Sequence, residues 1–275
     1  MMAIHESEEE IRQHEEELKN NFDMSKFDLT GKVAVITGGN TGLGQGYAIA
    51  MAKAGADIFI PTFGTAEWEN TRKLIESVGR KVEFMDVDLT KPGIPKKVIA
   101  TAIEKLGHID ILVNNAGMIK RNPLLESKDE DWDRVIAINL TAVYHMSLEA
   151  SKVFAKQKYG KIINICSMLS FQGGKYIPSY TASKHGVAGL TKAFASEMGA
   201  YNVTVNAIAP GYIKTENTAP VRADQTRNDE ILGRIPMGHW AEPYELMGPA
   251  VFLASDASAY INGAIIPVDG GYLVR

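Results

Sequence analysis

The sequence is poor in cysteine, because its 275 residues include only Cys166. A disulfide within the chain is therefore impossible, which fits a reducing compartment, and we expect a cytoplasmic protein. Cys166 ends a predicted buried strand, so we interpret it as a small apolar core residue and not as a nucleophile.

Long apolar runs are missing as well. No segment stays apolar over the length that a membrane span needs, and the glutamate-rich first residues resemble neither a signal peptide nor a transit peptide. We therefore expect no membrane partner.

The sequence also lacks a basic stripe. Its 29 lysines and arginines are outnumbered by 33 acidic residues, which gives a formal net charge of −4. Nucleic acid is thus excluded as an expected partner, although a local positive pocket could still bind a small anion. The histidines His145, His185 and His239 lack ligand spacing, so we predict no metal site.

What the sequence does have is the composition of a globular protein, with 45% hydrophobic and 23% charged residues. Its length suits one α/β domain, which we assign to residues 29–275. Residues 1–28 are predicted to be a charged N-terminal extension. Within it, Glu8 to Lys19 would either form a charged surface helix or stay disordered.

Apolar runs of strand length alternate with helical stretches along the domain. Such runs are typical of strands that helices cover on both faces, so we predict a doubly wound parallel sheet, the Rossmann fold, with its ligand crevice at the carboxyl ends of the strands. The irregular segment 212–240 is predicted to form a substrate lid of short helices. The seven predicted strands are 32–37, 57–61, 81–86, 109–114, 161–166, 203–208 and 264–268.

A glycine-rich loop follows the first predicted strand and precedes a helix from Tyr47 to Ala54. Glycines let the backbone approach a pyrophosphate, and the helix N-terminus offers free N–H groups, so this arrangement is typical of a dinucleotide cradle. Taken alone, the loop could be a tight turn. The residues expected to form the cradle are Thr37, Gly38, Asn40, Gly42, Leu43 and Gly44.

Tyr180 and Lys184 stand four residues apart, which puts both side chains on one face of a helix. A free tyrosine has a pKa of about 10, and a nearby cation favours phenolate and lowers that pKa. The pair therefore predicts a tyrosine that exchanges protons with an alcohol or a ketone. The alternative is a tyrosine that packs against the sheet.

Further motifs complete a known pattern. Asn114-Asn115-Ala116-Gly117 ends one strand, Ser167 ends another, and Pro210-Gly211 ends a third, with Thr215 four residues beyond. Asn139 lies on a long predicted helix. With the glycine loop and the Tyr180/Lys184 pair, the chain from about Leu29 to Arg275 resembles the short-chain dehydrogenase/reductase family.

The resemblance implies catalytic roles for four residues. Tyr180 would be the proton donor to a ketone, Ser167 would hydrogen-bond the same oxygen, and Lys184 would lower the pKa of the tyrosine and bond the nicotinamide ribose. Asn139 would hold a water molecule that links Lys184 to solvent. Taken singly, Ser167 could be a turn former and Asn139 could bond local backbone.

The resemblance also implies further contacts with a nicotinamide dinucleotide. Asp88 would meet the adenine ring, although it could equally cap the following helix. It implies, too, a homotetramer with residues 242–271 at the subunit contacts. The other cofactor-binding residues that it implies are Asn115, Gly117, Tyr180, Lys184, Pro210, Gly211, Ile213 and Thr215.

The choice between NAD and NADP depends on the tip of the second strand. An acidic residue there usually binds the ribose 2′-hydroxyl, but residues 60–66 contain none. No arginine or lysine stands there or in the glycine turn to neutralise a 2′-phosphate, whose burial without a partner would be unfavourable. We therefore predict NAD, with NADP as the alternative.

Segments 164–174, 209–215, 222–224 and 246–255 resemble one branch of the family, the 2-dehydro-3-deoxy-D-gluconate 5-dehydrogenases, also called 2-deoxy-D-gluconate 3-dehydrogenases. This implies a hydride transfer between the cofactor and a keto sugar acid from hexuronate breakdown. The alternatives are a gluconate 5-dehydrogenase and a non-catalytic dinucleotide-binding regulator. The substrate carboxylate would bind Arg121, Lys175 or Arg222, unless these are solvated surface charges.

Overall fold

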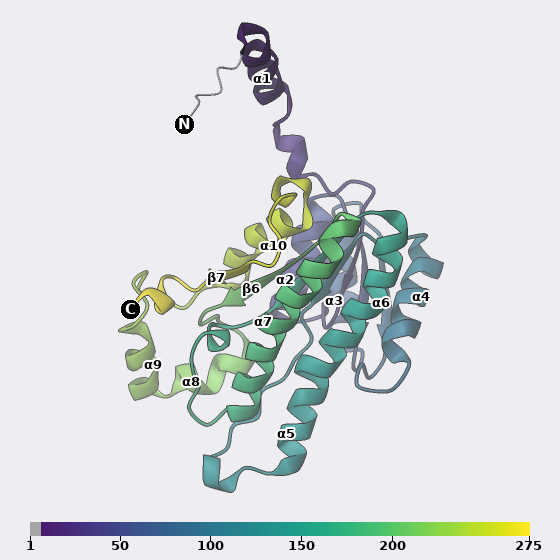
Figure 1. Ribbon diagram of the computed structural model, residues 1–275. Helices are drawn as coiled ribbons and strands as arrows, with labels where there is room; N and C mark the ends of the chain where they lie inside the picture. Colours follow the sequence, from purple (N-terminus) through teal and green to yellow (C-terminus); the bar gives the residue numbers. More distant parts are fainter. Residues whose placement is uncertain (1–6) are drawn as a thin grey trace.

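A seven-stranded parallel sheet forms the centre of the computed structural model, which describes residues 7–275 (Figure 1). In the strand order β3-β2-β1-β4-β5-β6-β7, the chain adds β2 and β3 on one side of β1 and then crosses over to add β4 to β7 on the other side. This crossover defines a doubly wound sheet, so the predicted Rossmann fold is confirmed. The strands are β1 (Val33–Ile36), β2 (Asp57–Thr62), β3 (Val82–Asp86), β4 (Ile111–Asn114), β5 (Gly160–Ile165), β6 (Val203–Pro210) and β7 (Ile265–Val268).

Helices cover both faces of the sheet and build two apolar layers. On one face, α2 (Gly42–Lys53), α3 (Trp68–Glu76) and α10 (Met247–Ala254) bury alternate strand residues such as Ala34 and Ile36. On the other face, α4 (Ile94–Leu106), α6 (Ala142–Gln157) and α7 (Pro178–Met198) bury the intervening Val33 and Val35. Burial on both faces explains why the strands are continuous apolar runs.

The carboxyl edge of the sheet carries the remaining short helices. Here lie α5 (Asp129–Ile136), α8 (Ala219–Ala223) and α9 (Gln225–Leu232), at the end of the molecule opposite the N-terminal helix (Figure 1). The segment predicted as a lid thus contains two short helices. Ile231, Ile235 and Trp240 from this segment pack with Tyr272 of the C-terminal turn η9 (Tyr272–Val274) and with Met168.

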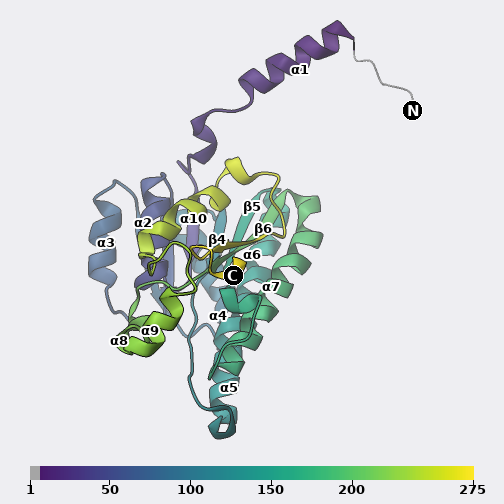
Figure 2. The same cartoon turned by 90° about the vertical axis from the view of Figure 1, so that its left-hand side faces the viewer.

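Helix α1 (Glu8–Asn20) stands away from the rest of the molecule (Figures 1 and 2). Of the two states left open by the sequence, the structure has the helix. Ser7 and Glu10 form a capping box, in which the Ser7 N–H donates to Glu10 Oε2 at 2.7 Å. The turn η1 (Met24–Phe27) joins the extension to the body, where Phe27 packs against Phe252 of α10.

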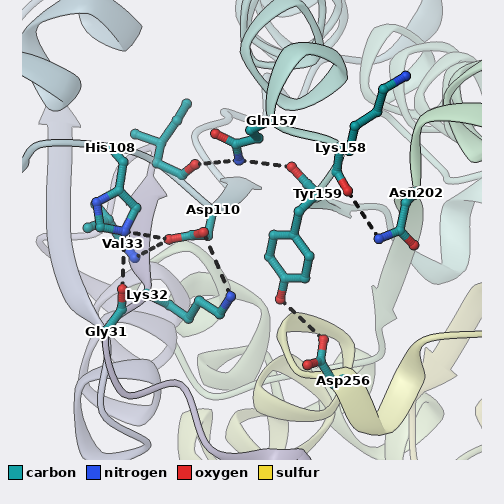
Figure 3. A network of polar contacts seen from close by, with 11 residues as sticks. Gly31, Lys32, Val33, His108, Asp110, Gln157, Lys158, Tyr159, Asn202 and Asp256 are labelled. Carbon is teal, nitrogen blue, oxygen red and sulfur yellow. Dashed lines mark hydrogen bonds and ion pairs between the residues drawn. The ribbon is translucent and has the colours of Figure 1, made fainter.

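The amino edge of the sheet is tied together by a polar network (Figure 3). Asp110 Oδ2 accepts a hydrogen bond from the Val33 N–H at 2.9 Å and lies 3.0 Å from His108 Nε2. The Lys32 ammonium lies 3.9 Å above the Tyr159 ring, and the Tyr159 hydroxyl donates to Asp256. These contacts join the starts of three strands to the turn η8 (Asp256–Ser258) after α10, so this edge is structural in character. No helix among residues 7–275 has both the length and the apolar character needed to cross a bilayer.

Candidate active site

The glycine turn between β1 and α2 leaves room for a ligand at the start of a helix. Gly38 and Gly42 have positive φ angles of 63° and 54°, a conformation that favours glycine. A Cβ on Gly44 would overlap the Gly38 carbonyl oxygen and the Asn115 side-chain nitrogen. The side chain of the N-cap residue Thr41 makes no capping hydrogen bond, so the first N–H groups of α2 remain available for a phosphate.

The predicted cradle residues Thr37 and Asn40, together with Asn115 after β4, hold the turn in place through side-chain hydrogen bonds. Thr37 Oγ1 accepts from the N–H groups of Asn115 and Ala116 at 3.0 and 2.9 Å. Asn115 Nδ2 donates in return to the carbonyl oxygens of Thr37 and Gly38. The Asn40 amide donates to Ala66 O at 2.8 Å, which ties the turn to the loop after β2. Leu43 packs partly buried against the core beneath the turn.

The other predicted cofactor residues also lie along the carboxyl edge. Gly211 follows Pro210 at the end of β6, where a Cβ would come within 2.6 Å of Asp269 Cα. Ile213 is buried and bridges to Ala241, and Thr215 caps the turn η6 (Glu216–Thr218).

Asp88 forms a local turn with Thr90 and does not cap the following helix α4, whose N-cap is Gly93. Its Oδ1 accepts from the Thr90 hydroxyl at 2.6 Å and from the Thr90 N–H at 3.0 Å. Hydrogen bonding by the Thr90 side chain lowers the pKa of Asp88. The carboxylate is therefore ionised and fixed in direction at the end of β3.

Ser167, Tyr180 and Lys184 meet where β5 ends and α7 begins. Ser167 is buried as the N-cap of the turn η4 (Met168–Ser170), and its hydroxyl lies near enough to the Tyr180 phenol to lower the pKa of that group. The Lys184 ammonium lies 5.6 Å from the centre of the Tyr180 ring and donates to Ile165 O at 2.5 Å. The structure thus brings together the three side chains that the sequence placed in one reaction.

The ionisation of the pair differs from the sequence prediction. Burial raises the pKa of Tyr180, while the nearby Ser167 hydroxyl and the charge of Arg121 act in the opposite direction. Burial also lowers the pKa of Lys184 to about 8. The helical spacing predicted the proximity of the two groups correctly, but it did not predict that burial raises the pKa of the phenol. Tyr180 therefore keeps its proton at neutral pH.

Asn139 lies in η3 (Ala137–Thr141), a π-helical turn between α5 and α6. Its buried side chain accepts from the Met118 N–H at 2.8 Å and donates to Met118 O and to the Ser183 hydroxyl. It also touches the space beside Gly117, where a Cβ would lie 3.1 Å from Asn139 Oδ1. The side chain thus joins the loop after β4 to α7, and π turns of this kind are frequent at functional sites.

A buried polar ladder behind the site escaped the sequence analysis. Asn114 Nδ2 donates to Ser147 Oγ at 2.9 Å and to Asn164 Oδ1 at 2.8 Å, and Asn164 Nδ2 donates to Thr191 Oγ1 at 2.9 Å. These residues link α6, β4, β5 and α7, the elements around the candidate catalytic residues. The available signal was an asparagine in each of two buried strands, because a buried amide needs partners.

The three candidate cations occupy different surroundings. Arg121 lies near enough to the Tyr180 phenol for its charge to lower the pKa of that group. Lys175 is exposed, 5.0 Å from the ring centre of its neighbour Tyr176. Arg222 donates from Nη2 to Thr215 O at 3.2 Å, so its guanidinium helps to hold the loop before α8.

A protein-family model described as enoyl-(acyl carrier protein) reductase matches residues 38–273. The chain belongs to the short-chain dehydrogenase/reductase family. The family explains why the cradle, the tyrosine–lysine pair and the serine occur together on one sheet edge. The protein is accordingly an oxidoreductase that depends on a nicotinamide dinucleotide.

Individual members of the family are also similar to this chain. An uncharacterized oxidoreductase of Escherichia coli K12, YgcW, is 52% identical over 93% of this chain and 98% of its own length. The 2-dehydro-3-deoxy-D-gluconate 5-dehydrogenase of the same organism is 52% identical over 92% of this chain and 99% of its own.

A solved structure from Agrobacterium tumefaciens has the same fold with a cofactor in place. That protein, provisionally named a 2-deoxy-D-gluconate 3-dehydrogenase, has NADP bound. It is 44% identical with a TM-score of 0.85, and the match covers 91% of this chain and 99% of that one. In residues 7–275, no three histidine, cysteine or acidic side chains gather in a way that could hold a metal ion.

Proposed function

We propose that this oxidoreductase interconverts a keto sugar acid and its hydroxy form, and that its substrate is 2-dehydro-3-deoxy-D-gluconate or the corresponding 5-keto acid. The observation that carries the proposal is the convergence of Ser167, Tyr180 and Lys184 at the sheet edge that also carries the glycine turn. The 52% identity to an enzyme of that name supports the choice of substrate. We further assign the reaction to hexuronate breakdown in the cytoplasm.

The residues of the chain fit a bound nicotinamide dinucleotide, which would supply or accept the hydride. The turn at Gly38, Gly42 and Gly44 and the start of α2 would hold the pyrophosphate. In the direction of reduction, Tyr180 gives its phenolic proton to the substrate oxygen as negative charge develops there. The Ser167 hydroxyl hydrogen-bonds the same oxygen and holds the carbonyl against the phenol.

Lys184 and Asn139 complete the proposed proton path. The ammonium of Lys184 lies against the Tyr180 ring and would bond the nicotinamide ribose. The π turn at Asn139 would hold a water molecule that links Lys184 to solvent. Because the phenol is protonated in the free protein, the arrangement is poised to donate a proton, and oxidation needs the same proton to leave through Lys184.

The pH dependence of the reduction should follow the ionisation of Lys184. Its pKa is lowered to about 8, so the ammonium is charged below that pH and loses its proton above it. Since the charged form stabilises the phenolate left after proton donation, we expect kcat/KM for reduction to fall as the pH rises through about 8. Initial rates between about pH 6 and about pH 10 would measure this. A rate that rises through the same range would contradict the role of Lys184.

A panel of keto acids tests the substrate. The protein is incubated with NADH or NADPH and with 5-keto-gluconate, 2,5-diketo-3-deoxygluconate and simple acyl and steroid ketones, and the absorbance of the reduced cofactor is followed. Highest kcat/KM on the 3-deoxy acid supports the proposal, and preference for 5-keto-gluconate favours a gluconate 5-dehydrogenase. Activity on acyl or steroid ketones alone would remove the sugar-acid interpretation, and dinucleotide binding without turnover would indicate a regulator.

Arg121 is our first choice among the three cations for the substrate carboxylate, because its charge reaches the Tyr180 phenol. We expect Arg121→Ala to raise KM for the keto acid by about tenfold to a hundredfold, since a charge-assisted hydrogen bond of about 1.5–3 kcal/mol is lost. The value of kcat should change less. Lys175→Ala is the matched control, and a larger rise in KM for Lys175→Ala or for Arg222→Ala would reject the choice.

For the cofactor we propose NAD as the preferred dinucleotide, with NADP as the alternative. The loop after β2 and the glycine turn contain no lysine or arginine that could neutralise a 2′-phosphate. Because the Agrobacterium relative has NADP bound, the cofactor preference of this chain has to be measured on the protein itself. Dissociation constants for both dinucleotides provide that measurement.

We also propose that the protein is a homotetramer with residues 242–271 at its subunit contacts. Tyr244 and Tyr260, both in this segment, are strongly exposed in the single chain, as expected of residues that a neighbouring subunit covers. Elution from gel filtration at the 30.0 kDa mass of one chain would contradict the tetramer.

A further inference from the structure

The pairing of β2 with β3 brings an acidic side chain to a position where the sequence of β2 has none. Thr62, the last residue of β2, lies opposite Asp86, the last residue of β3. In doubly wound folds the tip of this second strand is where an acidic residue meets the adenosine ribose. Asp86 is exposed at that tip, although it is 24 positions from Thr62 in the chain.

One carboxylate oxygen of Asp86 fixes the loop that follows β2. Asp86 Oδ1 accepts the Gly64 N–H at 2.7 Å. The Thr62 hydroxyl donates to Gly64 O at 2.7 Å and accepts from Trp68 Nε1 at 3.0 Å. The loop therefore has a defined shape, and the carboxylate has a defined direction. The second oxygen, Oδ2, makes no hydrogen bond or ion pair with any other residue in the part of the chain that the structure describes.

The neighbouring cations are engaged elsewhere. The Arg72 guanidinium lies 5.1 Å from the Phe84 ring centre and donates to Val82 O. Lys91 pairs with Asp88 at 3.7 Å. The negative charge of Asp86 is thus not cancelled by an ion pair in the described structure, and it acts on whatever occupies the tip of β2.

We propose that Asp86 is a specificity-determining residue for the dinucleotide: its free oxygen accepts the ribose 2′-hydroxyl of NAD, and its charge repels the 2′-phosphate of NADP. The inference rests on the proposed dinucleotide binding and deepens it. It assigns to β3 the role that an acidic residue of β2 has in other doubly wound folds. An unpaired carboxylate beside a phosphate dianion is unfavourable in both electrostatics and desolvation.

Glu67 is the competing source of negative charge, because it follows the same loop. Its Oε2 accepts from Asn70 Nδ2 at 3.2 Å, which turns the side chain toward α3. Asp86, by contrast, bonds the backbone of the loop itself. This difference makes Glu67 a suitable control for charge near the tip.

The test compares Asp86→Asn with Glu67→Gln by isothermal titration calorimetry with oxidised NAD and NADP. Asparagine keeps an oxygen that accepts the Gly64 N–H but removes the charge. We expect the ratio of Kd for NADP to Kd for NAD to fall by about tenfold or more in Asp86→Asn, and to stay within about threefold in Glu67→Gln.

The outcomes separate the inference from the function on which it rests. An unchanged ratio in Asp86→Asn, including an equal loss of affinity for both dinucleotides, would overturn the role of Asp86. A fall in the ratio for Glu67→Gln of equal or greater size would overturn it too. A wild-type protein that binds neither dinucleotide contradicts the proposed function instead. If the wild type prefers NADP and the ratio still falls in Asp86→Asn, the proposed cofactor preference is wrong but the role of the Asp86 carboxylate stands.

Discussion

Tyr180→Phe is expected to lower kcat by about 10²- to 10⁴-fold, because the variant keeps the ring but loses the hydroxyl that donates the proton. The phenol is the group whose pKa Ser167 lowers, and Lys184 lies beside its ring, so its loss removes the acid and leaves the cradle intact. The Kd for the dinucleotide should therefore stay within about threefold of the wild-type value. Steady-state rates and calorimetry on the same preparation measure the two effects.

Tyr176→Phe is the matched control, since it removes the same atom from an exposed ring four residues earlier. It should leave kcat within about twofold of the wild-type value. That result would show that the loss of kcat in Tyr180→Phe comes from the position of its hydroxyl and not from the removal of any tyrosine hydroxyl. Turnover by Tyr180→Phe at a rate near that of the wild type would reject the proton donor and, with it, the proposed mechanism. A parallel loss of cofactor affinity would instead indicate that the phenol shapes the cradle.

The strands of this fold were predictable because their local sequence and their burial agree. The predicted strand at 161–166 is observed as Gly160–Ile165, and the one at 264–268 as Ile265–Val268. The first strand is buried along its whole length, as helices on two faces demand, and the second is an apolar, partly buried edge strand. A motif that directly follows a strand in the sequence must lie at the carboxyl end of that strand. The position of Ser167 at the end of β5 was therefore predictable without knowledge of distant contacts.

The remaining features depend on contacts between distant residues, which local patterns do not contain. A long helix around Asn139 was predictable, but its π turn involves contacts with Met118 and Ser183, 21 and 44 residues away. Asp86 reaches the tip of β2 only through the register of two strands. The pKa of Tyr180 likewise depends on its burial, which the four-residue spacing to Lys184 does not report.

Gly44→Ala is expected to abolish measurable dinucleotide binding, with an increase in Kd of at least about a hundredfold. The added Cβ would overlap the Gly38 carbonyl oxygen, which belongs to the turn that shapes the cradle, and the Asn115 amide, which hydrogen-bonds that turn. Backbone cannot move aside as a flexible side chain can, so the glycine turn must separate from the start of α2. This displaces the N–H groups that would meet the pyrophosphate.

Gly189→Ala is the control, because a Cβ at this position in α7 meets nothing within 4 Å. Alanine should stabilise that helix by up to about 1 kcal/mol and leave cofactor affinity unchanged. Urea unfolding shows whether Gly44→Ala remains folded, and calorimetry then separates a lost cradle from a lost fold. A folded Gly44→Ala protein that binds the dinucleotide as tightly as the wild type would mean that the pyrophosphate lies elsewhere, because close packing at this turn leaves no room for both the methyl group and the present backbone.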